Sequence, residues 1–206
     1  MILDDASIVA VLKMYGFTAN STICEKIRTY IALLLRWNQR ISLTTVTDPL
    51  AVLRFHFGES AYARSAGLAA FGRLADVGSG AGFPGMVIGL VDPGIQVTLI
   101  EPNLKKSVFL AEVSRELRLG NIQVIRERME NITTGEFDFV TARALGHRNE
   151  FLDFARAHLT GRGKAVLWIG REDARKLILE EPGWRWSTPI SIPDSERRCI
   201  LAGSPD

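Results

Sequence analysis

The sequence predicts an α/β fold in which helices cover both faces of a parallel sheet, and three observations support this. Residues 1–65 contain only helix-type hydrophobic patterns, apolar runs of strand length alternate with helical segments from residue 73 onward, and two more strand-like runs close the chain. A chain of 206 residues is long enough to bury a substantial core without disulfides or a structural metal. We therefore expect one domain over residues 1–206, with a helical cap (residues 1–65) on an α/β core (residues 73–206).

The cap is expected to contain three helices. The first covers residues 6–15 and ends near Gly16. The second carries an apolar stripe at helical spacing, formed by Ile27, Tyr30, Ile31, Leu34 and Leu35. The third is expected to begin at Thr47-Asp48-Pro49, because a capping side chain followed by proline in the first turn is typical of a helix start.

The core is expected to alternate strands with helices. Apolar runs of strand length occupy residues 73–77, 96–101, 122–125, 137–142 and 164–169, and helical segments occupy residues 84–90, 104–119, 149–158 and 171–179. Because the apolar runs are almost continuous, they indicate parallel strands that are buried on both faces. Residues 184–192 and 197–202, joined by a turn at 193–196, predict a terminal hairpin. The hairpin brings the sheet to seven strands, the last of them antiparallel.

Composition excludes several classes of protein. The net charge is +2, which permits a nucleic-acid partner but does not require one. Cys24 and Cys199 lie in no metal-binding spacing and the three histidines form no metal motif, so we expect no metal. Asp4 and Asp5 interrupt the apolar run that a secretory signal needs, and no segment approaches the roughly 20 apolar residues of a membrane span. We therefore expect a cytoplasmic protein with no membrane partner.

A glycine-rich loop follows the first predicted strand and opens a helix. Gly78, Gly80 and Gly82 fall in this loop, at the place where an α/β sheet binds its ligand. Glycine lets the backbone turn tightly and approach a ligand without a Cβ in the way. Gly80, Gly82 and Gly85 also satisfy the G-x-G-x-x-G spacing of a dinucleotide site, but this short pattern is weak by itself.

Two acidic residues near the loop favour S-adenosylmethionine as the ligand. The carboxylate of Asp76 would repel the pyrophosphate of NAD, whereas it suits the positive sulfonium and amino groups of S-adenosylmethionine. Glu101, at the end of the second strand, is placed to bind the ribose hydroxyls that both cofactors share. Dehydrogenases usually lack the terminal hairpin. Together these features predict a Rossmann-like, seven-stranded class I methyltransferase with an N-terminal helical cap.

Several motifs in this order along the chain resemble the RsmG (glucose-inhibited division protein B) family. They are Trp37-Asn38, Leu43-Thr44, Asp48-Pro49, His56, Ser60, the loop with Phe83-Pro84-Gly85, and Thr141-Ala142-Arg143-Ala144. That family methylates N7 of a guanine in bacterial small-subunit (16S) ribosomal RNA. The resemblance therefore implies an S-adenosylmethionine-dependent enzyme whose partner is 16S ribosomal RNA or the small ribosomal subunit. We expect it to be a monomer.

The resemblance also implies which residues meet the cofactor. Gly78 and Phe83 match positions where the family's loop contacts it. Met129 and Glu130 follow the third strand, where the family's backbone meets adenine. Arg143, at the end of the fourth strand, matches an arginine at the junction of cofactor and substrate and is the expected catalytic residue.

The chemistry of guanine N7 determines what else is expected of the site. N7 carries a free lone pair, so we expect no general base, and catalysis rests on placing N7 in line with the methyl group. The alternative role for Arg143 is a structural salt bridge with Asp138 or Glu101. Other cations are expected to meet RNA phosphates at the same edge of the sheet, namely Lys105, Lys106, Arg126, Arg128 and Arg148.

The chain also departs from the family's pattern. Where the family commonly has Arg-His, this chain has Arg54-Phe55-His56, and Ile169 replaces a lysine that usually ends the fifth strand. Arg171 is a candidate to substitute for that lysine. These departures leave two alternatives open: a methyltransferase that acts on another RNA or a small molecule, and a non-catalytic RNA-binding or ribosome-assembly protein that retains the fold.

Overall fold

The computed structural model describes residues 3–65, 67, 72–143 and 146–206. The cap comprises α1 (Asp5–Met14), α2 (Ser21–Asn38), α3 (Pro49–Val52), the π-helical segment η1 (Leu53–Gly58) and α4 (Glu59–Ser65). The first three helices each begin at a capping side chain, supplied by Asp4, Asn20 and Asp48. Each cap accepts a backbone N–H from the residue three positions later, which satisfies one of the donors left free at a helix start.

The third predicted cap helix is interrupted by a π-helical turn. It runs as α3, η1 and α4 without a break, and η1 contains Phe55 and His56. Ser60 Oγ donates to the backbone oxygen of His56 at 2.6 Å, which satisfies one of the carbonyls in this turn. π-helical turns are frequent at functional sites, and η1 faces the candidate site described below.

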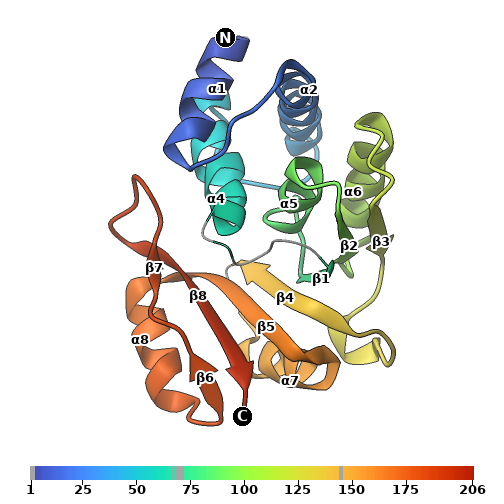
Figure 1. The fold of residues 1–206 in the computed structure, drawn as a ribbon. Helices are drawn as coiled ribbons and strands as arrows, with labels where there is room; N and C mark the ends of the chain where they lie inside the picture. Colours follow the sequence, from blue (N-terminus) through green and yellow to red (C-terminus); the bar gives the residue numbers. More distant parts are fainter. Residues whose placement is uncertain (1–2, 66, 68–71, 144–145) are drawn as a thin grey trace.

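The sheet contains the predicted parallel core and an antiparallel end (Figure 1). The parallel strands are β1 (Gly72–Val77), β2 (Ile95–Ile100), β3 (Ile122–Ile125), β4 (Phe137–Arg143) and β5 (Leu159–Gly170). β8 (Arg198–Pro205) pairs antiparallel with β5, and β6 (Trp184–Trp186) follows at the edge. The strand order is therefore β3-β2-β1-β4-β5-β8-β6, with β7 (Ile190–Ser191) also paired to β8.

The terminal hairpin differs from the prediction in one respect. The single strand predicted over residues 184–192 is two short strands, β6 and β7, so the sheet has eight strands where seven were predicted. Pro189 lies between them and has no N–H to donate to a strand ladder, which explains the interruption. The parallel core and the antiparallel closing strand are confirmed.

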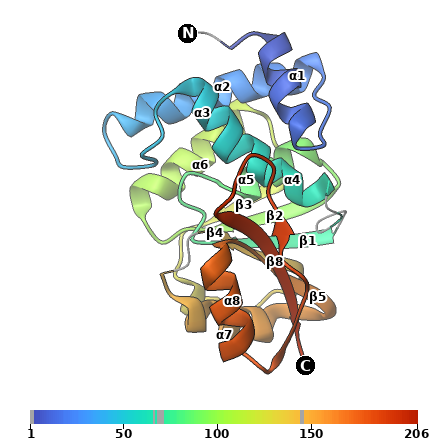
Figure 2. The same ribbon diagram turned by 90° about the vertical axis from the view of Figure 1, so that its left-hand side faces the viewer.

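Helices cover both faces of the sheet, as predicted. They are α5 (Gly85–Val91), α6 (Leu104–Glu116), α7 (Arg148–His158) and α8 (Arg171–Glu180). Leu74 of β1 belongs to a hydrophobic cluster that includes the cap, α5 and α6, whereas its neighbour Ala75 belongs to a second cluster with α7 and α8. Figure 2 shows the cap above the sheet and α7 and α8 below it. The carboxyl ends of the parallel strands therefore meet at one edge, where their loops converge.

Candidate active site

The glycine-rich loop leaves β1 at this edge. Gly78, Gly80 and Gly82 have φ values of +67°, +55° and +91°, in the left-handed region that favours glycine. A Cβ at Gly78 would meet no other atom within 4 Å, and one at Gly80 would meet only the backbone oxygen of Gly78 at 3.7 Å. These two glycines therefore face open space. A Cβ at Gly82 would lie 2.2 Å from the Tyr30 hydroxyl, so this glycine is needed for packing against the cap.

Asp76 lies beneath the loop and is almost completely buried. Its carboxylate accepts the Thr141 hydroxyl at 2.8 Å and the backbone N–H of Gly85 at 3.2 Å, so it ties β1 to β4 and to the start of α5. Burial raises the pKa of Asp76 to about 7, although hydrogen bonds from Thr141, Gly85 and Ser79 oppose this rise. Asp76 is thus a poorly solvated carboxyl group whose ionised form is disfavoured by burial.

Glu101 connects the loop to the next helix. One carboxylate oxygen accepts the N–H of Gly80 at 2.8 Å and the other accepts the N–H of Asn103 at 2.9 Å. Asn103 in turn caps α6 through Lys105 and Lys106. Each carboxylate oxygen has a second lone pair, so these bonds leave capacity for ligand hydroxyls.

Phe83 joins the loop to the cap. Its ring stacks between those of Tyr30 and His56, with centroid distances of 5.5 and 4.6 Å. The Tyr30 hydroxyl also donates to the backbone oxygen of Ala81 at 2.6 Å. Burial, with a contribution from nearby Arg143, lowers the pKa of His56 to about 4, so the stacked imidazole is neutral at physiological pH.

The Trp37-Asn38 and Leu43-Thr44 motifs are connected to the His56 ring of this stack. The Asn38 side chain binds the backbone of Leu43 and Thr44 through three hydrogen bonds. The Thr44 hydroxyl lies 2.8 Å from His56 Nε2. The motifs therefore form one chain of contacts from the cap to the glycine-rich loop.

Met129 and Glu130 lie in the short helix η2 (Met129–Asn131), which follows β3. They line a cavity of about 300 Å³ between η2 and α7. Met129 is partly buried against the second hydrophobic cluster, and Glu130 is exposed. Their predicted contact with adenine stays a prediction.

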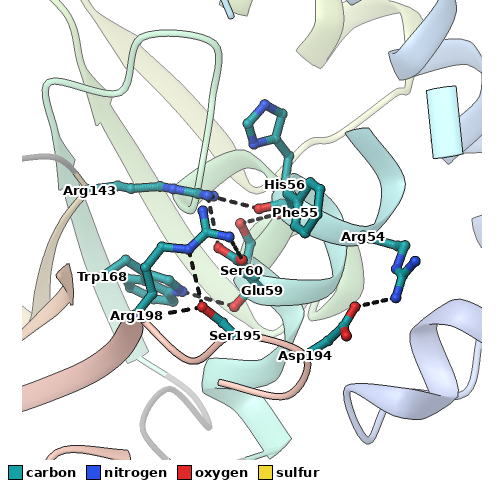
Figure 3. Close-up of polar contacts among 10 residues, drawn as sticks. All are labelled: Arg54, Phe55, His56, Glu59, Ser60, Arg143, Trp168, Asp194, Ser195 and Arg198. Carbon is teal, nitrogen blue, oxygen red and sulfur yellow. Dashed lines mark hydrogen bonds and ion pairs between the residues drawn. The ribbon is translucent and has the colours of Figure 1, made fainter. Parts of the chain in front are cut away.

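Arg143 lies at the end of β4, and the structure gives it a partner that differs from both expected ones. Its Nη2 donates to Glu59 Oε2 and to the backbone oxygen of Phe55, each at 2.8 Å (Figure 3). The expected alternative salt bridge with Asp138 or Glu101 was therefore wrong in its partner. Arg143 Nη1 is buried and has no hydrogen-bond partner among the described residues.

Arg198, at the start of β8, is the main site residue that sequence reasoning missed. Its Nη2 lies 2.6 Å from Glu59 Oε1, and its guanidinium stands over the Phe55 ring at 5.5 Å. The backbone oxygen of Glu59 accepts the Trp168 Nε1–H at 2.9 Å. A usable signal existed, because the start of an antiparallel closing strand lies beside the carboxyl end of β5.

A pocket of about 680 Å³ opens beside these residues, at the carboxyl ends of β4 and β5. Its lining residues are Arg143, Gly146, Arg148, Asn149, Glu150, Trp168, Ile169, Gly170, Asp173 and Arg198. Ile169, which stands where the resemblance led us to expect a lysine, thus lines the pocket. Arg171 was expected to compensate, but its Nη2 donates to Ser191 Oγ at 2.8 Å instead.

The other predicted cations are dispersed. Arg148 lines the pocket but pairs with Glu180 at 2.6 Å. Lys105 lines a separate groove of about 610 Å³ together with Arg36 and Arg40. In the part of the chain that the structure describes, no cluster of metal-ligating side chains occurs, and no helix has the length and apolar character of a membrane span.

Comparison with known proteins identifies the family. The family model described as rRNA small subunit methyltransferase G matches residues 23–187. A ribosomal RNA small subunit methyltransferase G of Chromohalobacter salexigens is 35% identical over 174 residues, which cover 84% of this chain and 82% of that protein.

Solved structures with the same fold are more distant in sequence. A ribosomal protein L11 methylase from Lactobacillus delbrueckii subsp. bulgaricus has a TM-score of 0.60 at 17% identity, over 74% of this chain and 80% of that one. M. jannaschii TYW2, solved in complex with AdoMet, has a TM-score of 0.50 at 16% identity, over 65% of this chain and 67% of that one. The class I methyltransferase fold is confirmed, and the chain belongs to the rRNA small subunit methyltransferase G family, which its motifs resemble.

Proposed function

We propose that this chain transfers a methyl group from S-adenosylmethionine to N7 of a guanine in the 16S RNA of the small ribosomal subunit. The observation that carries the proposal is the placement of two features at one edge of the sheet. The open glycine-rich loop follows β1, and the arginine-lined pocket lies at the ends of β4 and β5. We infer that the first feature holds the cofactor and the second holds the nucleotide, in a monomeric enzyme of the cytoplasm.

The residues around the loop fit S-adenosylmethionine. Gly78 and Gly80 leave open space, so a ligand can approach the backbone. Glu101 keeps lone pairs for ribose hydroxyls, and η2 carries the predicted adenine contacts. A positively charged ligand above the loop would favour the ionised form of Asp76, whose carboxyl group is buried beneath it. When bound, S-adenosylmethionine supplies an electrophilic methyl group on a positive sulfur.

The chain's own task is to bind and orient the guanine. N7 needs no deprotonation, so a fixed position in line with the methyl group accounts for most of the rate. Trp168 and Ile169 offer apolar surface in the pocket, and the Trp168 ring is held by its hydrogen bond to Glu59. Arg143 is fixed by Glu59 and Phe55, so its guanidinium is a pre-positioned hydrogen-bond donor that can orient the nucleotide in the pocket.

The proposal is tested by single-turnover transfer of labelled methyl to small ribosomal subunits that lack the modification. We expect one labelled guanine, with the methyl group on N7. Arg143→Ala should reduce transfer by 100-fold or more, on the order of the loss of one preorganised donor. Arg185→Ala is the matched control, because Arg185 pairs with β8 at Ser204, far along the strand from Arg198.

Each outcome bears on one of the alternatives. Tight cofactor binding without transfer to any RNA would contradict the proposal and favour a binding or assembly protein. Transfer to a different RNA or to a small molecule would contradict only the proposed substrate. Ile169→Lys would then be the first substitution to test in the pocket.

A further inference from the structure

We propose that Arg198 binds a phosphate of the target nucleotide, as the outer half of a clamp in which Glu59 holds Arg198 and Arg143 side by side. The proposal rests on the proposed function, because it names how that substrate is held in the pocket. The three side chains come from α4, β4 and β8, and they meet at the pocket (Figure 3).

Glu59, Arg143 and Arg198 form a cluster with an excess of positive charge. The Glu59 side chain is only 1% exposed, and its two oxygens bind one guanidinium each. Two positive groups thus share one negative group, so the three side chains together carry a net charge of +1. A phosphodiester carries one negative charge, so a bound phosphate would make the cluster neutral. Arg143 is the more buried of the two cations, and an anion bound beside it offsets part of the cost of burying its charge.

Both guanidinium groups keep N–H donors that Glu59 does not use. A guanidinium has five N–H groups, and Glu59 occupies only one nitrogen of each arginine. Arg143 Nη1 is buried without a partner in the described part of the chain. The Arg198 side chain is 38% exposed, whereas that of Arg143 is 16% exposed. Arg198 is therefore the arginine that an approaching phosphate meets first.

Arg198 is already fixed in place before a ligand binds. Its guanidinium lies over Phe55, and its backbone N–H donates to Ser195 Oγ at 3.2 Å. The hairpin turn itself is fastened to the cap by an ion pair between Arg54 and Asp194. Because the side chain has little freedom left to lose, binding an anion costs less conformational entropy.

The acidic residues of the pocket limit where the anion sits. Glu150 and Asp173 line it from α7 and α8, whereas the two arginines of the clamp come from strands. A phosphate is therefore expected on the strand side. This placement also leaves N7 free, since an arginine that donated to N7 would block its lone pair.

Calorimetric titration of guanosine, guanosine 5′-monophosphate and guanosine 3′-monophosphate tests the clamp. The cofactor site is first filled with S-adenosylhomocysteine, so that guanosine and its monophosphates can bind only in the pocket. We expect wild-type protein to bind one monophosphate roughly tenfold or more tightly than guanosine, as a charge-assisted hydrogen bond provides. The preferred isomer identifies which phosphate is held.

Variants assign the preference to Arg198. The ratio of the affinity for the preferred monophosphate to the affinity for guanosine should fall toward one in Arg198→Ala. Arg198→Lys should keep part of the preference, because lysine retains the positive charge but lacks the planar, multi-donor guanidinium. Arg185→Ala should leave the ratio unchanged. A ratio compares two ligands on the same sample, so partial unfolding of a variant does not alter it. An unchanged ratio in Arg198→Ala, or no phosphate preference in the wild type, overturns the clamp.

The methyl-transfer assay separates this failure from failure of the proposed function. If subunits are methylated at guanine N7 but the phosphate preference is the same in Arg198→Ala as in the wild type, the clamp is wrong and the proposed function stands. If the preference depends on Arg198 but no guanine is methylated, the clamp stands as a nucleotide-binding device and the proposed function is wrong.

Discussion

Replacing Asp76 by asparagine should change how the stability of the protein depends on pH. The carboxyl group is fully buried, and its pKa rises from 3.8 to about 7. A raised carboxyl pKa means that the folded state binds the proton more tightly than the unfolded state does. The associated stability is therefore complete below pH 3.8, declines as pH rises toward 7, and is absent above it.

The size of the effect follows from the pKa values. One pKa unit corresponds to about 1.4 kcal/mol, so raising the pH from 5 to 8 should cost the wild type about 3 kcal/mol through this group alone. Asparagine has no charge to bury and removes this pH dependence. Its amide oxygen can still accept the N–H of Gly85, and its NH₂ group can donate to the Thr141 hydroxyl, so any further cost of the substitution is the same at every pH.

Urea unfolding of both proteins at pH 5, 6, 7 and 8 measures the difference. The stability of Asp76→Asn relative to the wild type should rise by about 3 kcal/mol across this range, whatever the constant offset. Asp153→Asn on the exposed face of α7 is the control, and its difference from the wild type should stay flat. A relative stability of Asp76→Asn that is the same at pH 5 and pH 8 would refute the claim that Asp76 is destabilised by burial of its charge.

Three further predictions concern the loop and the pocket. Tyr30→Phe leaves the oxygen of Ala81 without its donor, so urea unfolding should show a loss of about 1–3 kcal/mol and calorimetry a weaker S-adenosylmethionine affinity. Gly82→Ala should destabilise the protein more than Gly80→Ala in the same unfolding assay, because both strain a positive φ but only the former places a Cβ 2.2 Å from the Tyr30 hydroxyl. Ile169→Lys adds a cation to the pocket lining, so RNA binding should tighten at low salt and its salt dependence should steepen, which filter binding at several salt concentrations will show.

The sequence was most informative where structure depends on neighbours in the chain. Asp48 followed by Pro49 predicted a helix start, and the cap forms there because the side chain reaches a backbone N–H three residues away. The glycines of the loop predicted a turn that other residues resist, and three of them have positive φ values. The apolar runs predicted the parallel strands, because burial on both faces leaves no polar alternation.

Prediction was weaker where local geometry interrupts a regular pattern. The residues around Arg54-Phe55-His56 continue a helical pattern, and nothing in it signals the π-helical turn of η1. Within residues 184–192, Pro189 already argued against one continuous strand, and it separates β6 from β7. The candidate cofactor residues could be proposed from the sequence because they follow strands, whereas the role of Glu59 became evident only from its contacts with Arg143 and Arg198.

The sequence alone therefore determined the fold class, the loop and the family, since these follow from periodicity, backbone preferences and motifs. Only the tertiary structure decided which charges meet. Arg143 pairs with Glu59 rather than Asp138 or Glu101, and Arg198 joins them although its neighbour Arg197 has the same side chain and stays exposed. A charge has no period and no preferred sequence separation, and its partner is chosen by the packing of the cap and the closing strand on the sheet.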